Sequence, residues 1–465
     1  MKKILLASLS LVIMFGSCKK KKNETTTTTT SDTAVVLTGD ISASKTLTAD
    51  KKYVLKGFVY VMDGATLTIE AGTVIKGDKA TKGTLVIARG GKINAVGTAA
   101  KPIIFTSSLD AGARYQGDWG GVILLGKAPI NPTGGEAKIE GGLTATGGGD
   151  EKKYIYYGGT DANDNSGTMK YVRIEFAGIA FSPDNEINGL TMGGVGAGTT
   201  ISYIQVYRSG DDSYEWFGGT VNCDHLVATY GWDDDFDTDF GFSGKVQFGV
   251  SQRAKAVADV SGSNGFESDN DANGSTNSPQ TKAVFSNMTI VGPVLTGSST
   301  SGINANFQNG AQIRRNSSES IINSVIIGFP IGLYIDGTKG TKTIENVKSG
   351  SLKFKNNIIA GCATPWKSDA ATTADSTYFI AIKALNTVVT NVEDAKLTDP
   401  YKFAPSLQTP AGTPNYLLQA GSPAAAGADF TGFTGFEAVS YRGAFDGSNN
   451  WMAGWTSFDA ENTKY

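Results

Sequence analysis

Two pairs of adjacent aspartates are the residues of this sequence whose types and spacing most clearly suggest chemistry. Asp211 and Asp212 are followed 22 residues later by Asp233 and Asp234. If one turn of the fold has about this length, the four carboxylates lie on one edge and repel each other. Calcium would relieve the repulsion, because it takes about six to eight oxygen ligands in irregular geometry. The pairs therefore predict calcium ligation.

A second acidic string resembles the first half of a calcium-binding loop. Asp269, Asp271 and Asn273 alternate before Gly274, while the position of the bidentate glutamate carries Gln280. We therefore expect these three side chains to ligate calcium, but not within a complete EF-hand. Turn chemistry remains an alternative, since Asp, Asn and Gly also cap loops.

Alternation of acids also marks the segment between these strings. Asp235, Asp237 and Asp239 occupy every second position. We assign all three as candidate calcium ligands. A strand with one solvated face that buries Phe236 and Phe240 would give the same pattern.

Aromatic and basic side chains next to these acids suggest a ligand-binding surface. Tyr214, Trp216 and Trp232 could stack on sugar rings, and Arg208 could bond an anionic or hydroxyl group. Packing of Trp216 in the core explains its position equally well.

Catalysis is the alternative to binding. A polysaccharide lyase would combine calcium with a basic residue, for which Arg208, Lys245 and Arg253 are candidates. A glycoside hydrolase would need two facing carboxyl groups, and Asp212 with Asp234 is the pair to test. None of these residues lies in a motif that defines its role, so we favour a protein that is not an enzyme.

Composition narrows the remaining possibilities. The 465 residues include 41 Lys and Arg and 44 Asp and Glu, so a nucleic-acid partner is not expected. His225 is the only histidine, which argues against imidazole triads and multi-histidine zinc sites. Cys223 and Cys362 could pair or remain two buried thiols.

An internal repeat indicates the fold that positions these residues. Leu67, Ile69, Gly72 and Ile75 recur 18 residues later as Leu85, Ile87, Gly90 and Ile93. A short strand, a glycine corner and a second strand form the unit of a single-stranded parallel β-helix, an all-β solenoid. Asn287, Asn323 and Asn356 recur in a second pattern and should stack at a corner. A β-sandwich is the alternative fold.

The chain divides into five segments. The residues before Cys18 resemble a secretory signal. Their apolar run is too short to span a membrane. A signal ending in cysteine predicts a lipoprotein. We expect a signal peptide at 1–17, a lipidated tether at 18–34, a β-helix with projecting loops at 35–362, an insertion with a short helix at 363–400, and a terminal coil at 401–465 whose Trp451 and Trp455 cap the open end.

Three segments carry a resemblance to a known group of proteins. They are Lys-Pro-Ile-Ile-Phe-Thr-Ser at 101–107, Glu-Trp-Phe-Gly-Gly-Thr-Val at 215–221 and Tyr-Arg-Gly-Ala-Phe at 441–445. The chain resembles β-helix envelope lipoproteins of Bacteroidetes-type bacteria. The resemblance implies a right-handed, pectate-lyase-like β-helix at the cell envelope, and it assigns no activity.

Together these features predict a protein anchored in the outer membrane by lipid on Cys18 and exposed at the cell surface. It would bind or scaffold an extracellular polymer, a glycan above all, or a surface protein, with structural calcium. A calcium-dependent lyase or glycoside hydrolase, and an adhesin or envelope-assembly component, are the alternatives.

Overall fold

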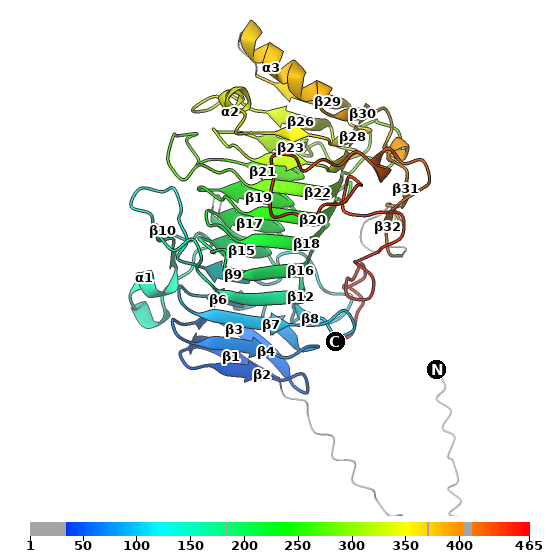
Figure 1. The fold of residues 1–465 in the computed structure, drawn as a ribbon. Coiled ribbons are helices and arrows are strands. Elements are labelled where there is room, and N and C mark those ends of the chain that lie inside the picture. Colours follow the sequence, from blue (N-terminus) through cyan, green and yellow to red (C-terminus); the bar gives the residue numbers. More distant parts are fainter. Residues whose placement is uncertain (1–33, 183–184, 370–371, 403–411) are drawn as a thin grey trace, which may run out of the picture. The chain divides into compact units, whose positions relative to one another are not determined.

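Three parallel β-sheets form the walls of a solenoid in the computed structural model, which describes residues 34–182, 185–369, 372–402 and 412–465 (Figure 1). Twenty-six strands of the described chain belong to this hydrogen-bonded stack. Successive rungs pair in parallel, which confirms the predicted all-β parallel β-helix and excludes the β-sandwich. Cys18 lies outside the described residues.

Each rung passes through wall 1, wall 2 and wall 3 in that order. Wall 1 contains β2 (Lys45–Leu47), β4 (Thr66–Ile69), β7 (Lys92–Val96), the first halves of β12 (Gly167–Glu175), β16 (Thr200–Tyr207), β18 (Asn222–Thr229), β20 (Lys245–Gln252) and β22 (Val284–Val291), then β24 (Ser320–Ile322) and β27 (Phe354–Lys355). Wall 2 contains the first halves of β1 (Val35–Ile41) and β3 (Lys52–Val61), β5 (Val74–Gly77), β8 (Ile103–Ser107), the second halves of the five long strands, then β25 (Val325–Ile327), β28 (Ile358–Ala360) and β30 (Thr387–Val389).

Wall 3 carries the acidic residues. It contains the second halves of β1 and β3, then β6 (Thr84–Ile87), β9 (Gly121–Leu125), β15 (Leu190–Gly193), β17 (Tyr214–Phe217), β19 (Phe236–Asp239), β21 (Phe266–Ser268), β23 (Asn309–Ile313), β26 (Ile331–Ile335) and β29 (Thr364–Ser368).

Shorter elements decorate the solenoid. They are the strands β10 (Ala137–Lys138), β11 (Tyr156–Tyr157), β13 (Ile179–Ser182), β14 (Asn185–Ile187), β31 (Leu397–Asp399) and β32 (Asn415–Leu418), the 3-10 turns at Thr146–Gly148, Val392–Ala395 and Pro423–Ala425, and the helices α1 (Glu151–Tyr154), α2 (Ile344–Ser349) and α3 (Thr373–Ala384). No helix in the described part of the chain is long and apolar enough to cross a membrane.

The repeat of 18 residues is real but does not mark one rung. Leu67 pairs with Ile93, 26 residues later, whereas Leu85 pairs with Val59 and Val122. Leu67 therefore belongs to wall 1 and Leu85 to wall 3. The first segment covers walls 1 and 2 of one rung, and the second covers wall 3 and wall 1 of the next rung. They look alike because every wall needs the same apolar alternation and corner.

A column of left-handed residues forms the bend between walls 1 and 2. Its members have φ between 52° and 60° and are Tyr171, Tyr203, His225, Phe248, Asn287, Asn323 and Asn356. Asparagine tolerates this conformation well, and the larger residues need compensation from packing. Stacking supplies it: ring centroids of Tyr171 and Tyr203 lie 4.5 Å apart, and those of Tyr203 and His225 lie 4.2 Å apart. The three asparagines occupy equivalent positions of successive rungs at this bend, as their recurrence predicted.

Helices close the C-terminal end of the solenoid. Phe379 and Ile382 of α3 and Ile344 of α2 join the main hydrophobic core. Strands β29 and β30 extend the stack past residue 362, where we predicted an insertion to begin. The predicted helix near 376–385 corresponds to α3.

The C-terminal tail, residues 412–465, lies along the side of the solenoid instead of over its open end (Figure 1). The Trp455 ring packs edge-on against Tyr171 and Tyr203, each at 5.9 Å, and Trp451 packs against His225 at 4.8 Å. The prediction that these tryptophans cap the end is therefore wrong.

Candidate functional site

Three neighbouring strands of wall 3 point carboxylates outward at the same register position. Glu215 on β17 pairs with Asp237 on β19, which pairs with Glu267 on β21. The flanking residues of each strand point into the core, as alternation in a strand requires. Parallel strands are about 4.8 Å apart, so this column brings like charges close together.

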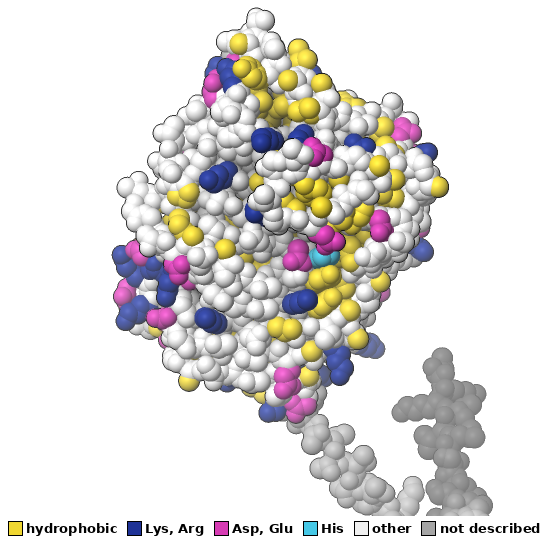
Figure 2. All heavy atoms as spheres, viewed as in Figure 1, with side chains coloured by type: hydrophobic (Ala, Val, Ile, Leu, Met, Phe, Trp, Pro, Cys, Tyr) yellow, Lys and Arg dark blue, Asp and Glu magenta, His cyan; other side chains and the backbone are white. Residues whose placement is uncertain are grey.

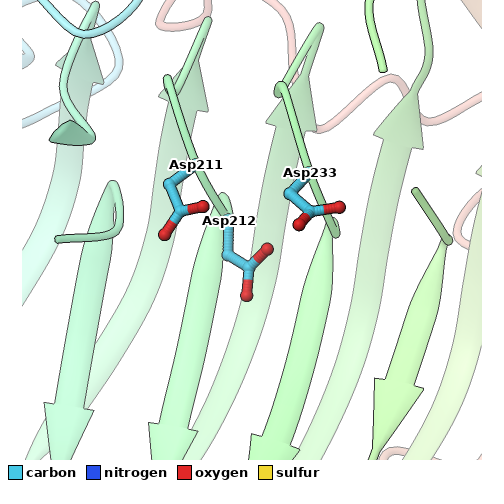
Figure 3. Close-up of side chains that lie close together, drawn as sticks. All are labelled: Asp211, Asp212 and Asp233. Carbon is cyan, nitrogen blue, oxygen red and sulfur yellow. The ribbon is translucent and has the colours of Figure 1, made fainter. Parts of the chain in front are cut away.

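The corner before these strands adds the two predicted aspartate pairs, which lie on neighbouring rungs as their spacing suggested. Asp212 Oδ1 accepts a hydrogen bond of 2.7 Å from the backbone N–H of Asp234. Asp234 Oδ1 accepts in the same way from Asn264. Asp211, Asp212 and Asp233 turn their carboxylates toward one another (Figure 3).

Wall 3 and its corner loops enclose a cleft of about 340 Å³, which we call the acidic cleft. Among the described residues, the side chains lining it include two guanidinium groups and twelve carboxylates. The guanidinium groups belong to Arg314 and Arg315, and the carboxylates to Glu140, Glu186, Asp211, Asp212, Glu215, Asp233, Asp234, Asp237, Asp239, Asp259, Glu267 and Asp269.

Burial and crowding make ionisation of these carboxyls unfavourable. Burial, followed by the charges of Asp234 and Asp269, raises the pKa of Asp237 well above its usual range. Burial and the charge of Glu140 do the same for the pKa of Glu215. Burial, opposed by a bond from Ser261, raises the pKa of Asp233 to about 6.

The carboxylate oxygens are spaced as ligands of a cation would be. Three groups each offer three oxygens within 4.8 Å of one another: Asp211, Asp212 and Asp233; Asp212, Glu215 and Asp237; and Asp234, Asp237 and Glu267. Two oxygens bound to one calcium ion at about 2.3–2.6 Å are at most about 5.2 Å apart. Oδ1 of Asp233 and Oδ1 of Asp237 are buried and have no hydrogen-bond partner among the described residues. The donor set therefore fits calcium.

The two arginines limit the charge at one end of the cleft. Arg314 Nε lies 2.8 Å from Asp269 Oδ1, and Arg315 Nη1 lies 2.6 Å from Asp269 Oδ2. Burial acts to lower the pKa of Arg314, but the charges of Glu267 and Asp269 outweigh it and raise the pKa. Asp269 is thus neutralised by arginine, which makes it a weaker metal candidate than predicted.

Asp235 is not part of the cleft, contrary to its prediction as a calcium ligand. Its side chain points inward and pairs with Arg253 at 2.8 Å, with both side chains fully buried. The alternation of acids breaks here because Asp235 belongs to the corner, whereas Asp237 and Asp239 belong to β19.

Asp271 and Asn273 lie apart from the acidic cleft, and their assignment as calcium ligands stays a prediction. Asp271 Oδ1 accepts from the backbone N–H groups of Asn273 at 2.9 Å and Ser275 at 3.2 Å. Neither residue lines the acidic cleft. This loop is an Asx turn, and its carboxylate is used by its own backbone.

Three predicted ligand-binding residues serve other purposes. Tyr214 and Trp216 are fully buried in the core, where their side chains cannot contact a glycan. The Tyr214 hydroxyl donates to the carbonyl of Ile204 at 2.7 Å. Arg208 is buried and pairs with Glu461 of the tail.

Trp232 is the one predicted aromatic residue placed near the cleft. It is partly exposed, and its indole N–H donates to Asp259 Oδ1 at 2.9 Å. Asp259 and Ser261 line the cleft, and Ser261 Oγ donates to Asp233 Oδ2 at 2.7 Å. Trp232 therefore lies at the rim, where it could contact a ligand.

Glu215, Glu267 and Arg314 were missed by the sequence analysis. A signal existed for two of them, because an aromatic residue followed by an acid opens all three strands, as Tyr-Glu, Phe-Asp and Phe-Glu. The contribution of Glu140 and Glu186 depends on loops folding over wall 3, for which the sequence has no signal.

The two cysteines of the solenoid are both buried and free. Burial raises the pKa of Cys362 to about 12. They form no disulfide, which settles the alternative left open by the sequence.

Comparison with known proteins gives one family. A family described as "pectate-lyase like beta helix domain" matches residues 39–406. No curated protein matches the chain.

Proposed function

The chain belongs to the family of pectate-lyase-like β-helix domains, and on that premise we propose that it binds an extracellular polysaccharide through divalent cations held in the acidic cleft. Membership of this family supports a polysaccharide-related role in general. Calcium is the expected cation, because the candidate ligands are all oxygens and their arrangement is irregular.

The excess of carboxylates over positive charges in the cleft carries this proposal. Twelve carboxylates face two arginines in about 340 Å³. Asp212, Asp237 and their neighbours would hold the cation. A bound cation would supply the missing positive charge and further coordination positions for hydroxyl or carboxylate oxygens of a ligand.

The state of the basic residues favours binding over lyase chemistry. A general base needs a pKa near the operating pH, whereas the pKa of Arg314 is raised by its acidic partners. Arg208, Lys245 and Arg253 do not line the cleft. The two arginines that line the cleft are both paired with Asp269, so among the described lining residues neither is a free base.

The hydrogen bonds of Asp212 and Asp234 count against the hydrolase alternative. Asp212 and Asp234 each use one oxygen to accept a backbone N–H of the next rung. Both carboxylates thus act in the corner of the solenoid.

The experiment is a polysaccharide array probed with the mature protein in calcium and in excess EDTA. We expect acidic polysaccharides to bind only in calcium and Asp237→Asn to abolish that signal. Asp110→Asn is the matched control, since Asp110 is exposed and does not line the cleft. Equal binding in EDTA would contradict the cation bridge, and new absorbance from unsaturated sugar ends would identify a lyase.

We also propose that lipid on Cys18 anchors the protein in the outer membrane with the solenoid at the cell surface. Support comes from the signal-like segment before Cys18. Labelling with radioactive palmitate should disappear in Cys18→Ser. Protease treatment of intact cells should degrade the solenoid; full protection would instead indicate a periplasmic location.

A further inference from the structure

A second cavity of about 420 Å³ lies between the solenoid and the C-terminal tail, and we call it the flank groove. Its floor is formed at the left-handed bend, by Tyr203, His225 and Phe248. Residues 435–437 of the tail form its upper wall. The acidic cleft is built on wall 3, so the two cavities have no lining residue in common.

Two lysines of the groove lack an acidic partner. Lys170 and Lys245 line it, and neither forms an ion pair with any described residue. The ammonium group of Lys170 lies 5.7 Å from the ring centroid of Tyr203, and that of Lys245 lies 5.9 Å from Phe436. Both ammonium groups lie beside aromatic rings, and the carboxylates of Asp224 and Glu437 line the same groove without forming an ion pair with either lysine.

The lysines bracket the groove along the solenoid axis. Lys170 belongs to β12 and Lys245 to β20, and two strands, β16 and β18, separate them. Three strand spacings correspond to about 14 Å. A ligand that contacts both lysines must be longer than one sugar ring.

Hydrogen-bonding groups alternate with the aromatic rings between the lysines. Asp224 Oδ1 is bonded by Ser202 Oγ at 2.5 Å and by His225 Nδ1 at 2.6 Å, which fixes its orientation. Glu437 and Asn222 are exposed at the edge. Figure 2 shows the histidine at the surface among hydrophobic and acidic side chains. Carboxylates and amides beside aromatic rings suit a ligand with hydroxyl groups and apolar ring faces.

We infer that the flank groove binds an acidic oligosaccharide, whose anionic groups face Lys170 and Lys245 and whose hydroxyl groups face Asp224 and Asn222. This site requires no metal ion. It is independent of the cation-dependent binding proposed for the acidic cleft.

The test uses mature protein in excess EDTA, with hexagalacturonate as the probe and its fully methylated ester as the uncharged control. We expect calorimetry to detect binding of the acid and none of the ester. The double variant Lys170→Gln with Lys245→Gln should bind at least roughly tenfold more weakly, and arginine at both positions should restore binding.

Matched controls separate this site from the cleft. Lys56→Gln removes an exposed lysine elsewhere, and Asp237→Asn alters the cleft; both should leave binding in EDTA unchanged. Absence of binding in EDTA, equal binding of the ester, or unchanged affinity of the double glutamine variant would each overturn the inference.

Discussion

Replacing Asp237 by asparagine should stabilise the metal-free protein and reduce the stabilisation that calcium confers. Asp237 pairs with Glu215 on one side and Glu267 on the other. Two unit charges about 4.8 Å apart repel by about 3.5 kcal/mol at an effective dielectric constant of about 20. Partial protonation reduces this repulsion, so Asp237→Asn should stabilise the metal-free protein by about 1–3 kcal/mol near pH 8.

Calcium should stabilise the variant less than it stabilises wild type. A ligand present at about 100 times its Kd stabilises the folded state by about 2.7 kcal/mol. Asp237 belongs to two of the three carboxylate groups, and loss of a shared ligand that weakens calcium binding roughly 10- to 100-fold would remove about 1.3–2.3 kcal/mol of that gain.

Denaturant unfolding of wild type, Asp237→Asn and Asp110→Asn, each in EDTA and in calcium, measures both effects. Asp110→Asn should behave like wild type in both conditions, because Asp110 is exposed and outside the cleft. If Asp237→Asn destabilises the protein in EDTA, or if calcium stabilises it as much as wild type, the charge-repulsion reasoning is refuted.

Three further predictions concern ionisation and the tryptophans. In EDTA, the free energy of unfolding should fall as the pH rises from about 4 to above 6. The reason is that the pKa of Asp233 is about 6 in the folded state, above about 3.9 for an unfolded aspartate. Denaturant unfolding at pH 5 and pH 8 measures this effect, and equal free energies at the two pH values would contradict it. Burial raises the pKa of Glu319 to about 8. The free energy of unfolding of wild type should therefore fall by about 1.4 kcal/mol between pH 7 and pH 9, and Glu319→Gln should not show this fall. Parallel pH profiles for the two proteins would contradict this prediction. Trp232→Ala should weaken polysaccharide binding with little effect on unfolding, whereas Trp216→Ala should destabilise by about 3–5 kcal/mol; the reverse result would contradict the placement of either ring.

The acidic edge was predictable because its spacing equals one rung. Asp212 and Asp234 are 22 residues apart and are bonded to each other across adjacent rungs. Spacing alone does not give the direction of a side chain, and a corner residue does not follow the alternation of a strand. Asp235 was therefore assigned to the cleft, although it is buried against Arg253.

The repeat predicted the fold correctly but its register incorrectly. Leu67 and Leu85 look alike because each begins an apolar wall, and a solenoid with three similar walls repeats more often than once per rung. Only hydrogen bonding between distant segments distinguishes a wall from a rung. The same ambiguity made Trp216 appear exposed, since the sequence does not state which face of β17 points inward.

The tail on the flank has a consequence for the order in which the chain folds. Each rung contacts mainly its neighbours, so rungs can assemble in sequence as the chain emerges from a ribosome or an export channel. Tyr171 and Tyr203, however, are covered by Trp455, which is synthesised more than 250 residues later. Their aromatic surface must stay exposed until synthesis is complete, and a chain interrupted before residue 412 would keep it exposed permanently. This part of the solenoid is therefore the one most in need of protection from aggregation during biogenesis.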